Sequence, residues 1–227
     1  MDKFDTINGI FSLTIAGIVG IYPANPGRSC SSCLNLREKI QNGKPEVSKR
    51  LEGDGVQYSK RAFPPILGVG SRLLILGSMP GEESLRRQQY YAHRRNAFWP
   101  IMARLLDLPD DSSYSRRAEA LIDHGIALWD VMAECRRTGS LDSAICSESI
   151  RVNDFATLLR DHPGIGLILF NGGTAEREFK RRVVPTLGRA AASIETLRLP
   201  STSSAYAAMP FEAKLAAWSM ILERMRG

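Results

Sequence analysis

The sequence predicts a three-layer α/β/α domain, with helices on both faces of a central four-stranded parallel sheet. Short apolar runs of strand length alternate along the chain with segments of helical character. Several of these runs stop at glycine, asparagine or proline, which are common where a strand ends. Strands that alternate with helices form parallel sheets, because each connecting helix packs back onto a face of the sheet.

Four apolar runs are the expected strands. They cover residues 72–76, 126–131, 166–170 and 193–199. The first three are nearly continuous in apolar residues, which is typical of parallel strands buried on both faces. Gly77, Asn171 and Pro200 follow three of the runs. Three loops therefore leave the carboxyl ends of strands, where ligands bind in sheets of this kind.

Five segments are the expected helices. They cover residues 97–107, 114–124, 151–161, 174–184 and 211–226. A turn-rich stretch at 108–112 separates the first two. We expect Asn153 to cap the third, because an asparagine side chain can accept a hydrogen bond from the first free N–H groups of a helix. The last is amphipathic and closes the domain.

Residues 1–60 differ from the remainder, so we expect a poorly structured N-terminal extension over 1–60 and a folded domain over 61–227. The apolar run from Ile7 to Tyr22 carries no charge, but it is shorter than the roughly 20 residues of a membrane span. It also lacks the basic start and the cleavage site of a signal peptide. The stretch that follows is rich in glycine, proline and charge, which is typical of a linker. A plain alternative is that the extension is not part of the native product.

Composition places the chain among ordinary soluble proteins with a basic balance. Its 227 residues are 44% hydrophobic and 24% charged. The formal net charge is +6 and the sequence pI is about 9.3. Such a balance suits a polyanionic partner such as nucleic acid. Many soluble proteins carry a similar charge without binding nucleic acid, so the charge alone assigns no function.

The four cysteines are too few and too unevenly spaced for a disulfide scaffold. We expect free thiols in a reducing, cytoplasmic setting. The alternative is a metal or iron–sulfur site that joins Cys30 and Cys33 to Cys135 and Cys146. The stretch around the last two looks helical, and it is far from any loop expected near residue 30, which favours the free thiols.

The first informative loop runs from Gly77 to Gly81, with the sequence Gly-Ser-Met-Pro-Gly, directly after the first strand. Two glycines and a proline make a tight turn in which main-chain N–H groups can face a ligand. The plain alternative is a generic connection from strand to helix.

The second loop, Tyr90 to Pro100, concentrates aromatic, basic and amide side chains in one short segment. Its arginines can meet phosphates, and an aromatic face can stack on an extruded base, worth about 1–3 kcal/mol. Asn96 can orient a water molecule or bind a base edge. The alternative is the start of a helix that packs in the core. We expect that role for Trp99, and base stacking for Phe98.

The third loop, Pro200 to Tyr206, is rich in hydroxyl groups. Serine and threonine side chains, with the neighbouring amides, are suited to holding DNA phosphates. The alternative is a helix cap with an ordinary turn, where the same residue types are common.

In this order and spacing, the three loops resemble motifs of the uracil-DNA glycosylase superfamily. Gly77 to Gly81 is similar to its first motif, His93 to Trp99 to the following His-Pro-x-Asn-x-Phe-Trp segment, and Pro200 to Ala205 to its second motif. The likeness is greatest to the hypoxanthine-DNA (deoxyinosine) glycosylase branch. That branch shares the Tyr-Tyr-Ala-His segment, the Gly-Ser-Leu-Asp stretch at 139–142 and Phe-Asn-Gly-Gly at 170–173. The resemblance covers residues 61–227.

Two positions depart from the superfamily pattern. Met79 stands where the mismatch-specific relatives have the asparagine that positions the attacking water. Leu199 stands in place of the second-motif histidine of other uracil glycosylases. The resemblance to the hypoxanthine branch therefore implies that Asn96 supplies the catalytic polar group.

The resemblance implies a monofunctional DNA glycosylase of base-excision repair, which flips a deaminated base out of double-stranded DNA and leaves an abasic site. Hypoxanthine is the expected base, with uracil and xanthine as further candidates. The expected base-binding residues are Gly77, Ser78, Met79, Phe98 and Asn171. The expected DNA-binding residues are Ser201, Thr202, Ser203 and Tyr206, of which Tyr206 would fill the gap in the base stack. We expect a monomer that needs no metal or organic cofactor and binds no membrane.

Other interpretations stay open. Asn171 precedes two glycines and is as suited to shaping a turn as to touching a base. Met79 leaves room for a non-catalytic DNA- or nucleotide-binding module of the same fold, which would bind damaged DNA without releasing a base. Cys30 and Cys33 leave room for a redox or metal protein, with a visible absorbance band or stoichiometric zinc as its signature.

Overall fold

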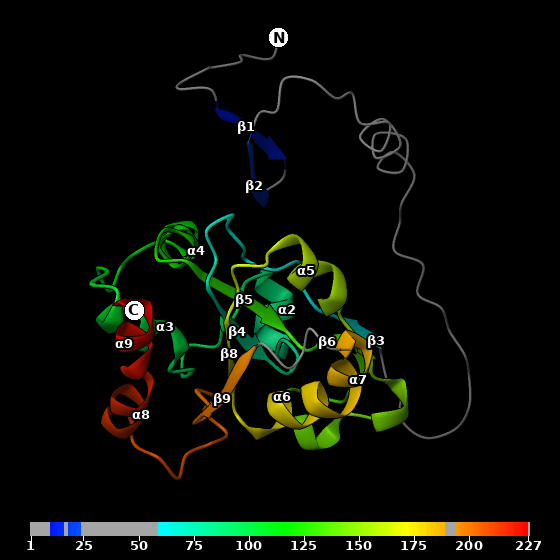
Figure 1. Ribbon diagram of the computed structural model, residues 1–227. Coiled ribbons are helices and arrows are strands. Elements are labelled where there is room, and N and C mark those ends of the chain that lie inside the picture. Colours follow the sequence, from blue (N-terminus) through cyan, green and yellow to red (C-terminus); the bar gives the residue numbers. More distant parts are fainter. Residues whose placement is uncertain (1–9, 16–17, 24–58, 189–193, 227) are drawn as a thin grey trace. The chain divides into compact units, whose positions relative to one another are not determined.

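The computed structural model describes residues 10–15, 18–23, 59–188 and 194–226 (Figure 1). The chain divides into two units, residues 1–55 and 56–227. The described part of the first unit is an antiparallel hairpin of β1 (Ile10–Ile15) and β2 (Ile18–Pro23). The expected poorly structured extension over 1–60 otherwise lies almost entirely outside the described residues and stays a prediction.

The central sheet of the second unit confirms the predicted fold class. Its four strands are β4 (Leu73–Gly77), β5 (Ile126–Asp130), β8 (Leu167–Asn171) and β9 (Glu195–Leu199). They pair in parallel in the order β5-β4-β8-β9. In this register Gly77 lies beside Asp130, and Asn171 lies beside Leu199. The polar residues that end the strands are thereby brought to one edge of the sheet.

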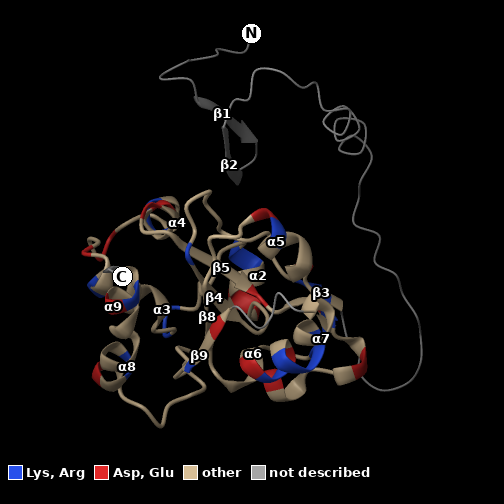
Figure 2. Cartoon of the chain, viewed as in Figure 1, with Lys and Arg blue, Asp and Glu red and all other residues tan. Residues whose placement is uncertain are grey.

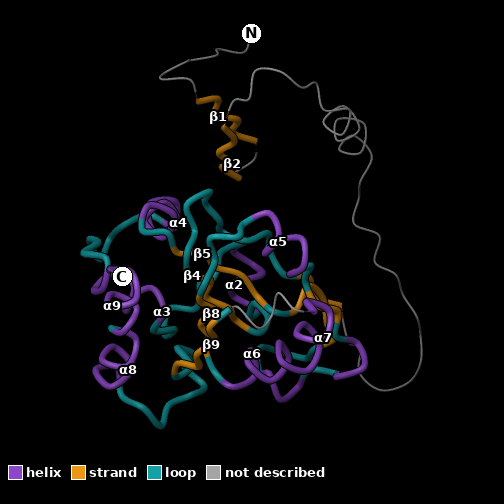
Figure 3. The backbone as a smooth tube through the Cα atoms, in the orientation of Figure 1, coloured by secondary structure: helices purple, strands orange, loops and turns teal. Residues whose placement is uncertain are grey.

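Helices cover both faces of this sheet (Figure 3). They are α2 (Glu82–Arg87), α3 (Phe98–Leu105), α4 (Tyr114–Asp123), α5 (Phe155–Asp161), α6 (Gly173–Glu178), α7 (Val184–Leu187), α8 (Phe211–Trp218) and α9 (Met220–Arg226). A π-helical turn, Phe179–Val183, joins α6 to α7. One helical layer packs α3 against α8, and the other packs α5 against α7. Among the described residues, no helix is both long enough and apolar enough to cross a membrane.

In α2, acidic and basic side chains are placed to suit the two ends of the helix (Figure 2). Glu82 and Glu83 occupy its first turn, while Arg86 and Arg87 occupy its last turn. The N-terminus of a helix carries partial positive charge and its C-terminus partial negative charge, so both placements are favourable. This short helix begins directly after the Gly77–Gly81 turn and keeps that turn in place.

A second, three-stranded antiparallel sheet was not predicted. It consists of β3 (Ser59–Arg61), β6 (Met132–Arg136) and β7 (Arg151–Val152), in the order β3-β6-β7. These strands are short and carry charged residues, so no apolar alternation marks them in the sequence. The helical interpretation of the Cys135–Cys146 stretch is therefore wrong. Cys135 is buried in β6, Cys146 lies between two short 3₁₀ turns, and Cys30 and Cys33 lie outside the described residues.

Three predicted helices also differ from the structure. The helix expected at 174–184 consists of α6, the π-helical turn and α7. The helix expected at 151–161 begins at Phe155, and its cap is Asp154, whose carboxylate accepts from the N–H of Thr157 at 3.0 Å. Asn153 instead donates its side-chain amide to the main-chain carbonyl of Asp130 at 2.8 Å. The helix expected at 211–226 is two helices, α8 and α9, which are separated at Ser219.

Trp218 at the end of α8 joins the core to the third loop. Its ring has no exposed surface and meets the Phe98 ring edge-on at a centroid distance of 5.9 Å. Its indole N–H donates to the carbonyl oxygen of Pro200 at 2.9 Å. The helix that closes the domain thus also fixes the point where the chain leaves β9.

We expect Trp218→Phe to lower the free energy of unfolding by on the order of 1–3 kcal/mol, because the Pro200 carbonyl loses its donor in a buried place. Urea unfolding followed by circular dichroism measures this. Val69→Ala, at a side chain that is 86% exposed, should change stability by less than about 0.5 kcal/mol. Equal midpoints for Trp218→Phe and the wild type would contradict this anchoring role.

Candidate active site

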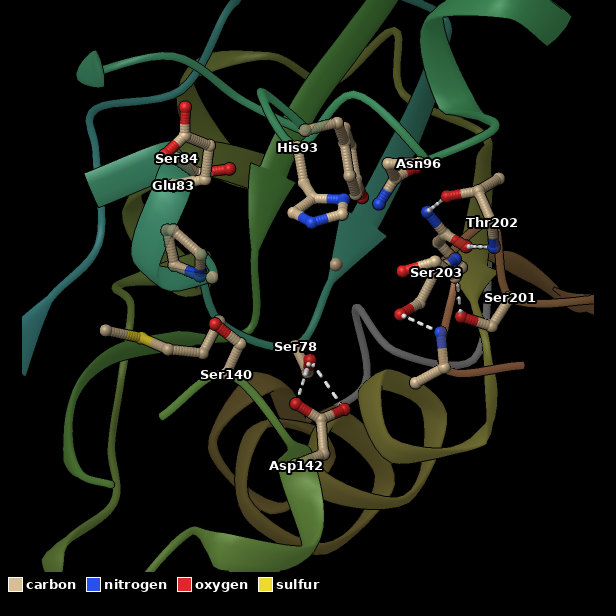
Figure 4. Close-up of a pocket in the computed structure, with 18 of the residues that line it drawn as sticks. Ser78, Glu83, Ser84, His93, Asn96, Ser140, Asp142, Ser201, Thr202 and Ser203 are labelled. Atoms are coloured by element: carbon tan, nitrogen blue, oxygen red, sulfur yellow. Dashed lines mark hydrogen bonds between the residues drawn. The ribbon is translucent and has the colours of Figure 1, made fainter. Parts of the chain in front are cut away.

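A cavity of about 450 Å³ opens at the carboxyl-terminal edge of the parallel sheet (Figure 4). All three loops that the sequence singled out contribute to its wall. The lining residues are Gly77–Ser84, Tyr90, Tyr91, His93, Asn96, Asp130, Ser140–Asp142, Asn171 and Ser201–Tyr206. Its size lies in the range of small-molecule pockets.

Gly77 is the point at which the first loop approaches the floor of this cavity. A Cβ atom at this position would collide with the carboxyl of Asp130 and lie 2.9 Å from the hydroxyl of Tyr91. Only glycine therefore allows the end of β4 to lie against these two side chains. The predicted need for glycine in this turn has a specific steric cause.

Asp130, the last residue of β5, was not predicted as a site residue. It lines the cavity, although the residue is only 3% exposed. The pKa of its carboxyl is raised to about 8, mainly by burial and further by the nearby Asp142, while Arg137 opposes the shift. Within the described part of the chain, its Oδ2 atom has no hydrogen-bond partner. Asp130 is thus a carboxyl group that keeps its proton near neutral pH.

Tyr91 lies beside Asp130 and presents an aromatic ring to the cavity. Its backbone has a φ of 53°, which is unusual for a bulky residue. Its ring stacks on that of Phe98 at a centroid distance of 4.1 Å. Burial, and to a lesser extent Asp130, raises the pKa of the Tyr91 hydroxyl, so this group stays protonated. Strained backbone of this kind is concentrated at functional sites.

A second carboxylate, Asp142, lies in the cavity wall and is held from two sides. The hydroxyl of Ser78 donates to it at 2.9 Å, and the guanidinium of Arg137 lies 3.8 Å away. Arg137 is itself buried and also donates to the carbonyl oxygens of Pro80 and Gly139. This cation therefore ties the first loop to the 139–142 stretch.

Asn96 and His93 point toward the centre of the cavity (Figure 4). The side-chain oxygen of Asn96 accepts from the N–H of Phe98 at 3.0 Å, where α3 begins. The His93 Nδ1 atom accepts from the N–H of Arg95 at 3.2 Å, so the ring proton of a neutral His93 is on Nε2. Both side chains are held at one end while the other end stays available to a ligand.

Asn171 and Thr202 form a two-bond clamp. The Asn171 amide N–H₂ donates to the Thr202 hydroxyl at 2.8 Å, and its oxygen accepts from the Thr202 N–H at 2.8 Å. The Thr202 carbonyl accepts in turn from the N–H of Ala97 at 2.9 Å. Thr202 has no exposed surface, so the clamp joins β8, the third loop and the start of α3 from inside.

This clamp corrects the predicted role of Thr202 in DNA binding. A buried residue whose hydroxyl and N–H are both occupied holds the loop instead of facing DNA. It also decides between the two interpretations of Asn171 in favour of shaping the loop, although Asn171 still lines the cavity. Of the predicted DNA-binding residues, Ser201, Ser203 and Tyr206 are at least partly exposed on this loop.

Lys214 of α8 supports the third loop from beneath. It is 5% exposed, and its ammonium donates to the carbonyl oxygens of Tyr206 at 2.9 Å and Ser203 at 3.4 Å. Burial lowers the pKa of this ammonium group. Two serine hydroxyls, Ser201 and Ser203, accept from N–H groups two residues further on. The loop is therefore rigid beneath, while Tyr206 is 42% exposed at its tip.

Phe98 does not line the cavity, and the predicted stacking of a base on its ring is corrected here. The ring has no exposed surface, because it is enclosed by Tyr91, Trp99 and Trp218. Met79 sends its side chain into a small apolar cluster with Met132 and Cys135, and contributes only part of its surface to the cavity wall. The tyrosines that do line the cavity are Tyr90, Tyr91 and Tyr206, and the Tyr91 ring is the one that stacks on Phe98.

Sequence reasoning missed the two carboxylates and the buried arginine. Asp130 had a usable signal, since it is a charged residue at the carboxyl end of a buried strand. Asp142 lies in the Gly-Ser-Leu-Asp stretch that carries the family resemblance, but no site role was expected of it. Arg137 had no signal, because it follows β6 of the unpredicted antiparallel sheet. Nowhere in the described ranges do three or more histidine, cysteine, aspartate or glutamate side chains gather as metal ligands would.

Two arginines suited to an anionic ligand lie next in the chain to His93, a residue of the cavity wall. Arg94 and Arg95 follow His93 and are exposed. Neither forms an ion pair with a described residue, whereas Arg86 and Arg87 are both paired with Glu83. Unpaired arginines beside a hydroxyl-rich loop are typical of phosphate-binding surfaces.

Comparison with known proteins gives consistent similarities. The family model of the uracil DNA glycosylase superfamily matches residues 64–223. A hypoxanthine DNA glycosylase from Methanosarcina barkeri is 40% identical over 114 residues, which cover 50% of this chain and 71% of the relative. A protein of the same name from Methanosarcina acetivorans is 41% identical over 117 residues, covering 51% and 73%. The solution NMR structure of a protein provisionally assigned as a uracil DNA glycosylase from Methanosarcina acetivorans has a TM-score of 0.62 at 34% identity, covering 74% of this chain and 99% of that one.

The hydrogen bonds of the Asn171–Thr202 clamp can be tested by substitution of Thr202. Thr202→Val keeps the shape of the side chain but leaves the Asn171 amide without its acceptor, so we expect a loss of about 1–3 kcal/mol in the free energy of unfolding. Thr202→Ser keeps the hydroxyl and should lose clearly less. Chemical denaturation measures both. If the serine variant is the less stable of the two, methyl packing and not the hydrogen bond holds the loop.

The raised pKa of Asp130 predicts how the stability of the protein depends on pH. Its pKa is about 3.9 in an unfolded chain and about 8 in the fold, so the folded state keeps a proton that the unfolded state loses between these values. The stability of the wild type therefore falls as pH rises across this range. Asp130→Asn removes the titration, so at pH 8 its Tm should exceed that of the wild type by on the order of 3 °C or more.

The Tm difference between Asp130→Asn and wild type should shrink toward zero near pH 4. Differential scanning calorimetry across this range measures it. The matched control is Asp123→Asn at an exposed position of α4, which should show no such trend. A Tm difference at Asp130 that is independent of pH would contradict the raised pKa.

Proposed function

Because the chain belongs to the uracil DNA glycosylase superfamily, we propose that it is a monofunctional DNA glycosylase that removes hypoxanthine from DNA and leaves an abasic site. The curated relatives that bear the name hypoxanthine DNA glycosylase support the choice of base. The observation that carries the proposal is the cavity at the carboxyl edge of the sheet, whose wall brings together Asn96, the buried carboxyl of Asp130, the half-buried carboxyl of Asp142 and a hydroxyl-rich loop.

A base inside a duplex cannot reach such a cavity, so it must first be rotated out of the stack. Extrusion costs only a few kcal/mol for a base that is already weakly paired, as hypoxanthine is opposite thymine. The exposed Tyr206 at the tip of the third loop is placed to fill the gap left in the stack. Ser201 and Ser203, with Arg94 and Arg95, would hold the phosphates on either side.

Inside the cavity the base would rest against Tyr91 instead of Phe98. The role of Phe98 is then indirect. The Phe98 ring stacks on the Tyr91 ring and thereby fixes the orientation of Tyr91. The main-chain groups of Gly77 and Ser78 would lie along one edge of the base. A flat aromatic wall with polar groups around it accepts any planar base and leaves the choice among bases to the polar groups.

Asn96 is the residue that we assign to the attacking water. Its oxygen already accepts one hydrogen bond from Phe98, and a second lone pair remains for a water proton. A carboxamide does not take up a proton at neutral pH, so Asn96 orients the water and does not act as a base. The N–H groups of the first loop and the Nε2–H of His93 are donors that can stabilise negative charge on the departing base.

Hypoxanthine, uracil and xanthine share one chemical feature that normal adenine and cytosine lack. Deamination converts a ring nitrogen that accepts a hydrogen bond into an N–H beside a carbonyl. A cavity with an acceptor such as Asp142 can favour this N–H and repel the lone pair of an unmodified base. Uracil and xanthine are therefore further candidate substrates, and the assay below includes them.

The proposal is tested with purified protein and end-labelled duplexes that carry one deoxyinosine, deoxyuridine or deoxyxanthosine. We expect release of free hypoxanthine and strand breaks that form only after alkali, because no step cuts the backbone. Asn96→Ala should lower the single-turnover rate by about 100-fold or more, the scale of losing one preorganised polar group. Glu119→Ala, exposed on α4, should retain the wild-type rate.

Two results would contradict the proposal. Binding of the inosine duplex by wild-type protein without release of any base would favour the non-catalytic module. Asn96→Ala with an unchanged rate would remove Asn96 from the mechanism while leaving the glycosylase activity in place.

A further inference from the structure

The proposed reaction leaves one group in the cavity without a task, the carboxyl of Asp130. It ends β5 at the floor of the cavity, and Gly77 is kept free of a side chain to make room for it. Its Oδ2 atom lacks a hydrogen-bond partner among the described residues. Buried polar groups without partners are rare and costly in folded proteins, so a group of this kind in a cavity calls for a ligand.

The surroundings of Asp130 do not compensate a negative charge. The titratable and charged groups that face it are Tyr90 and Tyr91 of the second loop, Tyr114 of α4, Asp142 of the 139–142 stretch and Arg137 after β6. Arg137 is the only cation of this set, and it is committed to Asp142 and to the carbonyl oxygens of Pro80 and Gly139. A carboxyl so placed holds its proton, and its pKa of about 8 agrees with this.

The two carboxyl groups of the cavity therefore differ in state. Asp142 is ion-paired and accepts from Ser78, as a carboxylate does. Asp130 is buried, unpaired and able to donate. A pair of carboxyl groups in different environments is a recurrent arrangement in glycosidic bond cleavage, where the neutral one serves as the acid.

Resting on the proposed function, we propose that Asp130 is the general acid of the reaction and donates its proton to a ring nitrogen of the departing purine. As the C1′–N9 bond breaks, its electron pair passes to the purine, which takes the proton from the Asp130 carboxyl and leaves as neutral hypoxanthine. The water held by Asn96 forms the new bond to C1′ and loses one proton to solvent. Asp130 regains a proton from solvent, so the net change is the addition of one water across the glycosidic bond.

This assignment explains how the enzyme acts without a strong base. A purine that leaves as an anion needs a strong nucleophile or strong donors, whereas a protonated purine leaves readily. General acid catalysis contributes about 10²–10⁴-fold, and an acid whose pKa lies near the working pH is the most effective. Asn96 can then be limited to positioning a neutral water.

The test measures single-turnover rates of hypoxanthine release from pH 5.5 to 10 for the wild type, Asp130→Asn and the exposed control Asp123→Asn. We expect the wild-type rate to be level at low pH and to fall about tenfold per pH unit above a value near 8 or higher, as the acid deprotonates. Asp130→Asn keeps the size of the side chain but has no transferable proton. Its rate should be about 10²–10⁴-fold lower and should lack this fall.

A duplex with 2′-fluoro-deoxyinosine, whose glycosidic bond resists cleavage, separates binding from chemistry. Asp130→Asn should bind it within about threefold of the wild type, since the loss is one of proton transfer. A rate for Asp130→Asn within about threefold of the wild type would overturn the proposal. So would a low rate that still falls above pH 8, because the fall would then belong to another group.

Failure of the proposed function looks different from failure of this inference. Wild-type protein that releases no hypoxanthine at any pH defeats the proposed function. Wild-type protein that releases hypoxanthine while Asp130→Asn matches it in rate and pH profile defeats only the role of Asp130.

Discussion

The double hydrogen bond between Asn171 and Thr202 is the constraint on which the site depends. It joins the carboxyl end of β8 to the loop that follows β9, and the Thr202 carbonyl carries the connection on to Ala97 at the start of α3. The segment that contains Asn96 and the loop that ends in Tyr206 are thereby fixed relative to the sheet. A glycosylase needs this rigidity, since its donors must already be aimed at the charge that develops as the bond breaks.

At Asp130 and Tyr91, by contrast, the cavity wall carries features that lower the stability of the fold. Asp130 is buried beside Asp142 without a cation of its own, and its raised pKa means that the fold is less stable at neutral pH than it would be with a neutral side chain. Tyr91 adds strain through its left-handed backbone. Both unfavourable features touch the same cavity, and the well-packed sheet and helices around it are what can support them.

The limits of sequence reasoning are clearest at Phe98 and Thr202. Both lie in motifs that belong to the site, but both side chains are buried. Phe98 supports the Tyr91 ring, and Thr202 holds the third loop in place. A motif marks the segment that matters, but whether a side chain points into a cavity or into the core depends on its neighbours from distant segments. The antiparallel β3-β6-β7 sheet was missed for a related reason, since short charged strands have no periodic apolar pattern of their own.

The sequence by itself determined the parallel α/β architecture, the three loops at the carboxyl ends of its strands and the place of Asn96 among them. It could do so because buried parallel strands are continuous apolar runs, and because segments of helical character separate them along the chain. Only the tertiary structure decided that Asp130 is buried and able to keep a proton, that Tyr91 and not Phe98 lines the cavity, and that Asp142 reaches the cavity wall with Arg137 beside it. Those properties arise from burial and from charges on segments far apart in the sequence, and such effects exist only once the chain has folded.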